Sequence, residues 1–180
     1  MKANVDMKRI LLSIVAIMLT VCSATSAEDK RPGAVTIEKR SVSYEAALRV
    51  AQEAMATAKK SNTDVAVVVV DSAGIPLVLL RADNATEQFV TGATRKAWTS
   101  VNFRNSTRAI LEDIKKNKED DSQLVYARNA LFLMGGVPLK GGDVIIGGVG
   151  VAGSVNGLED DRFARRAADS FTEMLKKKSK

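Results

Sequence analysis

The stretch Gly141-Gly142-Asp143-Val144-Ile145-Ile146-Gly147-Gly148-Val149-Gly150-Val151-Ala152-Gly153-Ser154 has the most unusual composition in the chain. Its β-branched residues alternate with glycines, and no charged residue follows Asp143. This pattern predicts a buried strand that another backbone or a ligand approaches closely, because glycine leaves no side chain between the two. We expect a hairpin turn at residues 140–143 to lead into this strand.

The same stretch contains a formal G-x-G-x-x-G at residues 148–153, the pattern of dinucleotide-binding loops. In those loops the glycines end a strand and open a helix directly, so that the phosphate meets the helix N-terminus. Here residues 154–157 separate the last glycine from the next helical pattern, and no later strand is left to carry the acidic ribose ligand. We therefore interpret the glycines as part of a core strand and not as a nucleotide loop.

The other strands are predicted from runs of apolar residues. Residues 65–70 form an uninterrupted run that fits a strand buried on both faces. After a turn at residues 71–74, residues 75–81 predict a second strand, and the short spacing implies an antiparallel hairpin. We also expect a strand at residues 131–133 and a short edge strand at residues 137–139.

Helices are predicted where apolar residues recur at steps of three and four. These patterns cover residues 44–58, with Ser43 as the N-cap, and then residues 89–101, 110–114 and 163–175. Hairpin-linked strands bracketed by helices predict an α/β fold of the α+β kind. We expect a single antiparallel sheet of about five strands flanked by helices, an α/β/α sandwich with a profilin-like arrangement.

The first 27 residues have the pattern of a secretory signal peptide. A basic start is followed by an uncharged apolar run at residues 10–21 and by small residues that predict cleavage near Ala27. The alternative is an uncleaved membrane anchor. We expect a periplasmic or secreted protein without membrane attachment after cleavage, in which residues 28–41 form a linker or arm and residues 42–180 form one domain.

Composition excludes several kinds of chemistry. The chain has no histidine, and its one cysteine, Cys22, lies in the predicted signal. Catalysis by Ser-His-Asp or Cys-His sets is therefore excluded, and no histidine or cysteine metal site is expected. The net charge of +6 owes much to the lysines at residues 176–180. No basic stripe with interleaved aromatic residues is present, so we do not expect nucleic-acid binding.

Six motifs in a fixed order resemble one known family. They lie at residues 67–77, 81–85, 93–100, 132–139, 146–153 and 160–164. Together they are similar to the GlcG/HbpS family, which includes the C-terminal domain of PduO. The resemblance implies an α/β/α fold that often assembles into homo-oligomers. It also implies haem binding in some members and, in one extracellular member, haem degradation and signalling to a sensor kinase.

The resemblance leaves the cofactor open. The histidines reported as haem or iron ligands in some members have no counterpart in this chain, because it contains no histidine. Met55, Met134 and Tyr44 carry potential iron-binding atoms, but each falls on an apolar face and is interpreted as core. Haem remains a candidate cofactor by resemblance only, and no metal site is predicted.

The predicted ligand-binding residues are Asp71, Arg81, Arg95, Lys96, Thr107, Gly135, Gly136 and Gly153. Asp71 follows a buried strand, where it either orients a ligand or caps the turn. Arg81 and Asp83 form either an ion pair at the mouth of the sheet or a surface pair that contributes little. By resemblance, Thr107 matches a threonine linked to haem, with helix capping as the alternative.

Residues 95 and 96 lie on the long predicted helix, and the resemblance places Lys96 opposite the Gly135-Gly136 turn. There its cation would hold a carboxylate or a propionate, and the alternative is an interface or solvated lysine. Glycines 135, 136 and 153 either line a pocket with backbone N–H groups or permit close packing. The acids Asp160 and Asp161 are interpreted as favourable charges in the first turn of the last helix.

We therefore expect a secreted or periplasmic protein that binds a small ligand, with haem or another tetrapyrrole as the candidate. One alternative is an enzyme that acts on a small carboxylate-bearing molecule through Lys96 or Asp71. The absence of histidine, and of cysteine after the predicted signal, weighs against that alternative. The other is an oligomeric structural or sensor-partner module without catalysis.

Overall fold

The computed structural model describes residues 36–116 and 127–178. Contacts divide the chain between Glu38 and Lys39, and the description below concerns the unit that begins at Lys39. Its elements in chain order are α2 (Tyr44–Lys60), β1 (Ala66–Asp71), β2 (Pro76–Arg81), α3 (Glu87–Asn102), α4 (Thr107–Lys116), β3 (Gly136–Gly141), β4 (Val144–Ala152) and α6 (Gly157–Lys178). Among the described residues, no helix is both long and apolar enough to span a bilayer.

The sheet has the strand order β2-β1-β4-β3, and all neighbouring strands are antiparallel. The glycine-rich stretch forms β4 in the interior of the sheet. Gly142, with a φ of +72°, lies in the turn of the β3–β4 hairpin, and Gly74, with a φ of +81°, lies in that of β1–β2. The expected hairpins and the α+β class are confirmed.

The expected strand at residues 131–133 is absent, so the sheet has four strands among the described residues and not about five. The physical reason is that side chains of α3 form hydrogen bonds with backbone groups at residues 130–131, which a neighbouring strand would otherwise pair with. The Leu131 N–H donates to Thr99 Oγ1 at 2.9 Å, and the Ala130 carbonyl accepts from Arg95 Nη2 at 2.6 Å. The segment therefore runs as coil along α3.

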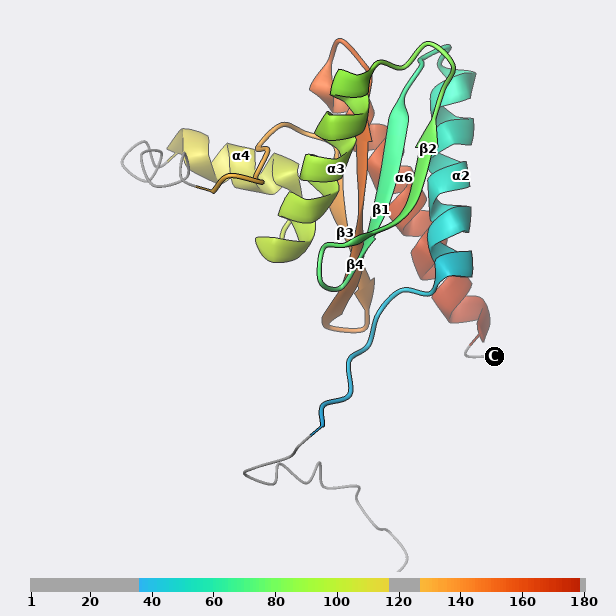
Figure 1. The fold of residues 1–180 in the computed structure, drawn as a ribbon, viewed down its shortest axis with the longest axis vertical. Helices are drawn as coiled ribbons and strands as arrows, with labels where there is room; N and C mark the ends of the chain where they lie inside the picture. The colour runs from blue at the N-terminus through green and yellow to red at the C-terminus, as the bar shows by residue number, and fades with distance from the viewer. Residues whose placement is uncertain (1–35, 117–126, 179–180) are drawn as a thin grey trace, which may run out of the picture. The chain divides into compact units, whose positions relative to one another are not determined.

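Helices cover both faces of the sheet, as Figure 1 shows. Helix α3 lies on one face, and α2 and α6 pack side by side on the other. Val68 and Val70 of β1 point to the core beneath α3, whereas Val67 and Val69 point to the core beneath α2 and α6. Strand β1 is thus buried on both faces, as its continuous apolar run predicts.

The glycines of β4 let α3 lie directly on the strand. A Cβ atom added to Gly150 would stand 2.0 Å from the Ala93 carbonyl oxygen, and one added to Gly148 would stand 2.6 Å from Ser100 Oγ. The G-x-G-x-x-G pattern therefore marks close helix-to-strand packing within a sheet. Helix α6 begins only at Gly157, so the glycines do not open a helix.

Candidate functional site

A cavity of about 570 Å³ opens beside the first half of α3, a volume within the range of small-ligand pockets. Its other walls are the coil that precedes β3 and the loop that joins β4 to α6. The lining residues are Gln88, Phe89, Thr91, Gly92, Arg95, Lys96, Leu111, Leu131, Leu133, Met134, Ala152, Gly153, Ser154, Val155, Asn156, Gly157, Leu158 and Asp160. Three of the predicted site residues, Arg95, Lys96 and Gly153, are among them.

A buried ion pair forms part of the cavity wall. Lys96 Nζ lies 2.8 Å from Asp160 Oδ2 and 2.9 Å from the Val151 carbonyl oxygen, and both charged side chains are about 95% buried. Asp160 Oδ1 accepts from the Ser154 N–H at 3.0 Å and from Ser154 Oγ at 2.7 Å. Lys96 therefore already holds a carboxylate, that of Asp160, and its charge is balanced within the protein.

Asp160 was not among the predicted site residues. The sequence pattern predicts only a favourable interaction of Asp160 with the helix dipole, and the residue does lie in the first turn of α6. Its side chain is nevertheless buried and ties three segments together, because it binds α3 through Lys96 and the β4–α6 loop through Ser154. The helical spacing could have predicted the burial of Asp160. Phe163, Ala164 and Ala167 follow it at three, four and seven residues, lie on the same helix face and are all buried.

Arg95 carries the second cation of the cavity wall. Its Nη2 donates to the Ala130 carbonyl oxygen, and its Nε is buried with no hydrogen-bond partner among the described residues. None of the described carboxylates pairs with this guanidinium. Arg95 and Thr99 together fix the coil at residues 130–131 against α3.

The mouth of the cavity is apolar. Leu133, Val155 and Leu158 are large side chains that are 56%, 109% and 49% exposed, and all three line the cavity. Phe89 and Met134, which are half-buried, and Ala152, which is buried, also contribute apolar side chains to the lining. A cluster of exposed apolar side chains around a hollow is typical of a binding site for an apolar molecule or partner.

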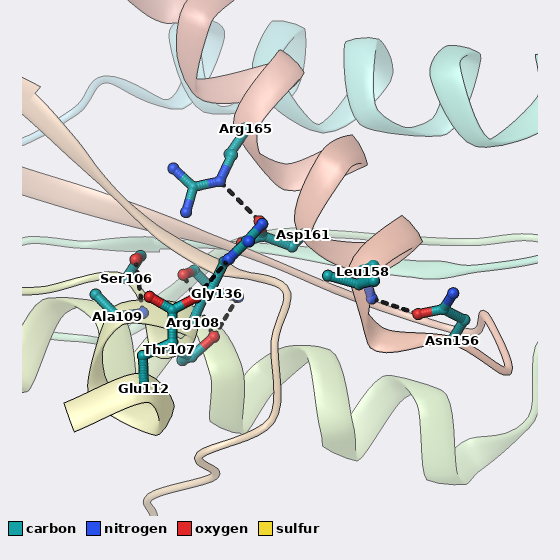
Figure 2. A network of polar contacts seen from close by, with 10 residues as sticks. All are labelled: Ser106, Thr107, Arg108, Ala109, Glu112, Gly136, Asn156, Leu158, Asp161 and Arg165. Carbon is teal, nitrogen blue, oxygen red and sulfur yellow. Dashed lines mark hydrogen bonds and ion pairs between the residues drawn. The ribbon is translucent and has the colours of Figure 1, made fainter. Parts of the chain in front are cut away.

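Thr107 lies outside this cavity. Its Oγ1 is fully buried and accepts from the Gly136 N–H at 2.9 Å, which joins the start of α4 to β3 (Figure 2). The expected capping role falls to its neighbour: Ser106 Oγ accepts from the Ala109 N–H at 3.2 Å. The Thr107 hydroxyl is thus committed to the fold and is not presented to a ligand in the cavity.

A second buried carboxylate, Asp161, holds two arginines. Its Oδ2 accepts from Arg165 Nε at 2.7 Å and from Arg108 Nη1 at 3.4 Å, while Oδ1 has no partner among the described residues. Figure 2 shows that this network lies next to the Thr107–Gly136 contact. Arg108 also donates to Glu112, and this hydrogen bond lowers the pKa of Glu112 below its usual value.

Asp71 and Arg81 lie outside the cavity. Asp71 Oδ1 accepts from the backbone N–H groups of Ala73 and Ile75 at 2.7 and 2.9 Å, so it caps the β1–β2 turn. It pairs with Gly147 in the β1–β4 register, whereas Lys96 binds Val151, four residues along β4 or roughly 13 Å away. The structure therefore does not bring Asp71 and Lys96 together.

Arg81 closes the loop after β2. Its Nη1 donates to the Ala85 carbonyl oxygen at 2.6 Å and to the Asp83 carbonyl oxygen at 3.3 Å. The expected pairing with the Asp83 carboxylate is replaced by this bond to the Asp83 backbone. Arg81 lines a different hollow, together with Asp64 and Asp83.

The Gly135-Gly136 turn does meet Lys96. A Cβ atom added to Gly135 would stand 2.8 Å from Asp160 Cβ and 3.2 Å from Lys96 Nζ, and Gly135 has a φ of +119°. One added to Gly136 would stand 2.3 Å from the Lys96 carbonyl oxygen. These glycines allow the strand to pass directly behind the ion pair. Gly153 similarly permits contact with the Asp64 backbone.

The described residues contain no group of three or more histidine, cysteine, aspartate or glutamate side chains placed to hold a metal ion. Among the described residues that line the cavity, only Met134 carries a thioether of the kind that can bind haem iron. Met134 is thus the one described thioether in the lining that could contact a haem iron.

A family model described as haem degrading protein HbpS-like matches residues 42–169. The chain is 32% identical over 138 residues to an uncharacterized 15.0 kDa protein of Citrobacter freundii. The matched region covers 74% of this chain and 94% of that protein. A crystal structure of HbpS is also similar, with a TM-score of 0.71 and 32% identity over 78% of this chain and 96% of that one.

A crystal structure of a double mutant of Streptomyces reticuli HbpS gives the same TM-score of 0.71 and the same 32% identity. It covers 78% of this chain and 93% of that one. A PduOC–haem complex shares the fold, with a TM-score of 0.65 and 23% identity over 72% of this chain and 94% of that one. These similarities agree with the antiparallel sheet and its flanking helices, and the chain belongs to the HbpS-like family.

Proposed function

We propose that this protein is a secreted or periplasmic protein that binds haem or a related tetrapyrrole in the cavity beside α3. The observation that carries the proposal is an apolar cavity of about 570 Å³, with Leu133, Val155 and Leu158 exposed at its mouth. Membership of the HbpS-like family supports the proposal, and so does the similarity to a PduOC–haem complex. The signal peptide predicted at residues 1–27 supports the location.

The cavity fits the ring of such a ligand better than it fits its iron. Phe89, Leu131 and Leu133 offer apolar walls for a flat macrocycle. Met134 supplies the one thioether among the described wall residues, and the Thr107 hydroxyl is hydrogen-bonded to β3. Haem, when bound, would bring the redox chemistry of its iron. The chain itself would bind the ring and exclude water from it.

Arg95 is the better candidate for a ligand carboxylate than Lys96. The Lys96 ammonium is balanced by Asp160, so a propionate there would have to displace a buried carboxylate. Arg95 also lines the cavity, and none of the described acids pairs with it. We therefore propose that Arg95 faces the acidic edge of the ligand, while Lys96 and Asp160 hold the wall in place.

A haemin titration tests the binding proposal. Purified protein should give a saturable change in the Soret band. Leu133→Asp and Leu158→Asp should each weaken binding at least tenfold, because each puts a charge at the apolar mouth. The matched control is Ile75→Asp, since Ile75 is also exposed, at 61%, but lies in the β1–β2 turn. No saturable change in the unaltered protein, or an equal loss in the control, contradicts the proposal.

The location is tested separately by cell fractionation with mass spectrometry of the protein's N-terminus. We expect the protein outside the cytoplasm, with a new N-terminus near Glu28. An intact N-terminus on cytoplasmic protein would contradict the predicted export without touching the binding proposal.

A further inference from the structure

A second, larger hollow of about 840 Å³ lies between the start of α2, the end of α6 and β4. We call it the basic groove. Its lining residues are Lys39, Arg40, Ser41, Val42, Ser43, Glu45, Ala46, Arg49, Ile146, Phe171, Met174, Leu175 and Lys177. None of them lines the cavity beside α3, so the two hollows are separate.

The floor of the basic groove is hydrocarbon. Val42, Ile146 and Phe171 are at least 95% buried, and Met174 and Leu175 are half-buried beside them. The Val42 N–H donates to the Ile146 carbonyl oxygen at 2.7 Å, which fixes the chain before α2 onto β4. The backbone at this point of the floor is thus hydrogen-bonded, and the floor offers apolar side chains to whatever lies on it.

The rim of the basic groove carries four exposed cations, Lys39, Arg40, Arg49 and Lys177, against one acid, Glu45. None of the four forms an ion pair with a carboxylate among the described residues. The situation differs along α4 and α6, where Arg108, Arg162, Arg165 and Arg166 each contact a carboxylate. The uncompensated positive charge at the rim favours an anionic occupant.

The N-terminus of α2 strengthens this preference. Ser43 caps the helix at the groove, and the positive end of the dipole of this 17-residue helix adds to the charge of the rim cations. An anionic group placed near Arg40 and Arg49 would therefore meet both side-chain charges and the helix field.

We propose that the basic groove binds an amphiphilic anion, a molecule with a carboxylate or phosphate head and a hydrocarbon chain. The head lies against Arg40 and Arg49, and the chain lies on Val42, Ile146 and Phe171. A concave floor of buried side chains suits a single molecule, whereas a flat bilayer surface would need protruding apolar side chains. The shared chemistry allows two sources, a free fatty acid or a lipid phosphate, and the test separates them.

The test is calorimetric titration of the whole protein with dodecanoate, with dodecyl phosphate and with uncharged dodecyl maltoside, all below their micellar concentrations. At least one anion should bind saturably and at least tenfold more tightly than the uncharged amphiphile. Tighter binding of dodecanoate points to a fatty acid, and tighter binding of dodecyl phosphate points to a lipid phosphate. Absence of saturable binding of both anions, or equal binding of the uncharged amphiphile, overturns the proposal.

Charge-reversal variants test whether the anion binds in the basic groove. The double variant Arg40→Glu/Arg49→Glu should weaken binding of the anion at least tenfold. Lys59→Glu/Lys60→Glu makes the same charge change on two exposed residues at the other end of α2 and should not weaken it comparably. Leu158→Asp, at the mouth of the other cavity, should leave it unchanged. Equal weakening in both double variants would mean nonspecific charge attraction, and weakening by Leu158→Asp would place the anion in the tetrapyrrole cavity; either result overturns the proposal.

Discussion

At the scale of single residues, the pair Lys96–Asp160 organises the cavity wall. Lys96 of α3 contacts Asp160 of α6 and the carbonyl oxygen of Val151 near the end of β4, and Asp160 accepts two hydrogen bonds from Ser154 in the β4–α6 loop. All these distances are within 3.0 Å. Buried ion pairs contribute little net stability when they replace apolar packing, but loss of one partner leaves an uncompensated charge. The pair is therefore best understood as a clamp that fixes the loop beside the cavity.

Removal of one partner of this clamp should be costly. We expect Lys96→Met to lower the free energy of unfolding by about 3–5 kcal/mol, because Asp160 would remain buried without its cation. The double variant Lys96→Met/Asp160→Asn should lose less than the single one, since no charge is left to bury. Urea denaturation followed by circular dichroism measures both. A single variant that loses under about 1 kcal/mol would show that the clamp is not needed.

The titration of Glu112 depends on its hydrogen bond with Arg108. The hydrogen bond from Arg108 lowers the pKa of Glu112 below its usual 4.5, so the pair's contribution to stability is complete above that value. It is lost as the pH falls through the lowered pKa. Arg108→Leu should raise the pKa of Glu112 towards 4.5, as measured by NMR of the Glu112 carboxyl carbon. An unchanged titration in the variant would mean that the hydrogen bond is absent in solution.

At the scale of elements, helix and strand periods predicted most of the fold. The apolar run of β1 and the three- and four-residue spacing of α2, α3 and α6 correspond to buried faces. The error at residues 131–133 has a tertiary cause, because Thr99 and Arg95 of α3 bind the backbone of the coil at residues 130–131. A local apolar pattern carries no information about such distant partners.

The packing of α3 on β4 gives a prediction about glycine. Gly150→Ala should lower stability by about 3 kcal/mol or more, or prevent folding, because its Cβ would stand 2.0 Å from the Ala93 carbonyl oxygen. Gly157→Ala is the matched control, since its nearest contact would be an ordinary 3.5 Å to Met134 Cβ. Thermal unfolding of both variants checks this. Equal melting temperatures would mean that α3 does not lie on the strand as described.

In the whole molecule, strand register and helix docking decide which of the predicted site residues come together. The sequence predicted Arg95, Lys96 and Gly153, which line the cavity, but it also predicted Asp71, whose partner on β4 lies four residues from that of Lys96. Thr107 was placed correctly at a helix start, yet its hydroxyl binds β3. Which candidates converge is decided by strand pairing and helix docking, and neither leaves a local signal in the sequence.

The family resemblance and the apolar mouth also bear on assembly. We expect the protein to form a homo-oligomer, since Leu133, Val155 and Leu158 together expose an unusually apolar surface. Size-exclusion chromatography with light scattering measures the mass without ligand. A monomer at the highest soluble concentration would contradict this expectation and leave those side chains for the ligand alone.

NMR of isotope-labelled protein can locate a tetrapyrrole that binds beside α3. Addition of haemin should broaden amide signals of residues 89–96, 131–134 and 153–158 through the unpaired electrons of the iron. Amides in the basic groove, at residues 39–49 and 171–177, should keep their signals. Broadening centred on that groove, or no selective broadening at saturation, would contradict tetrapyrrole binding beside α3.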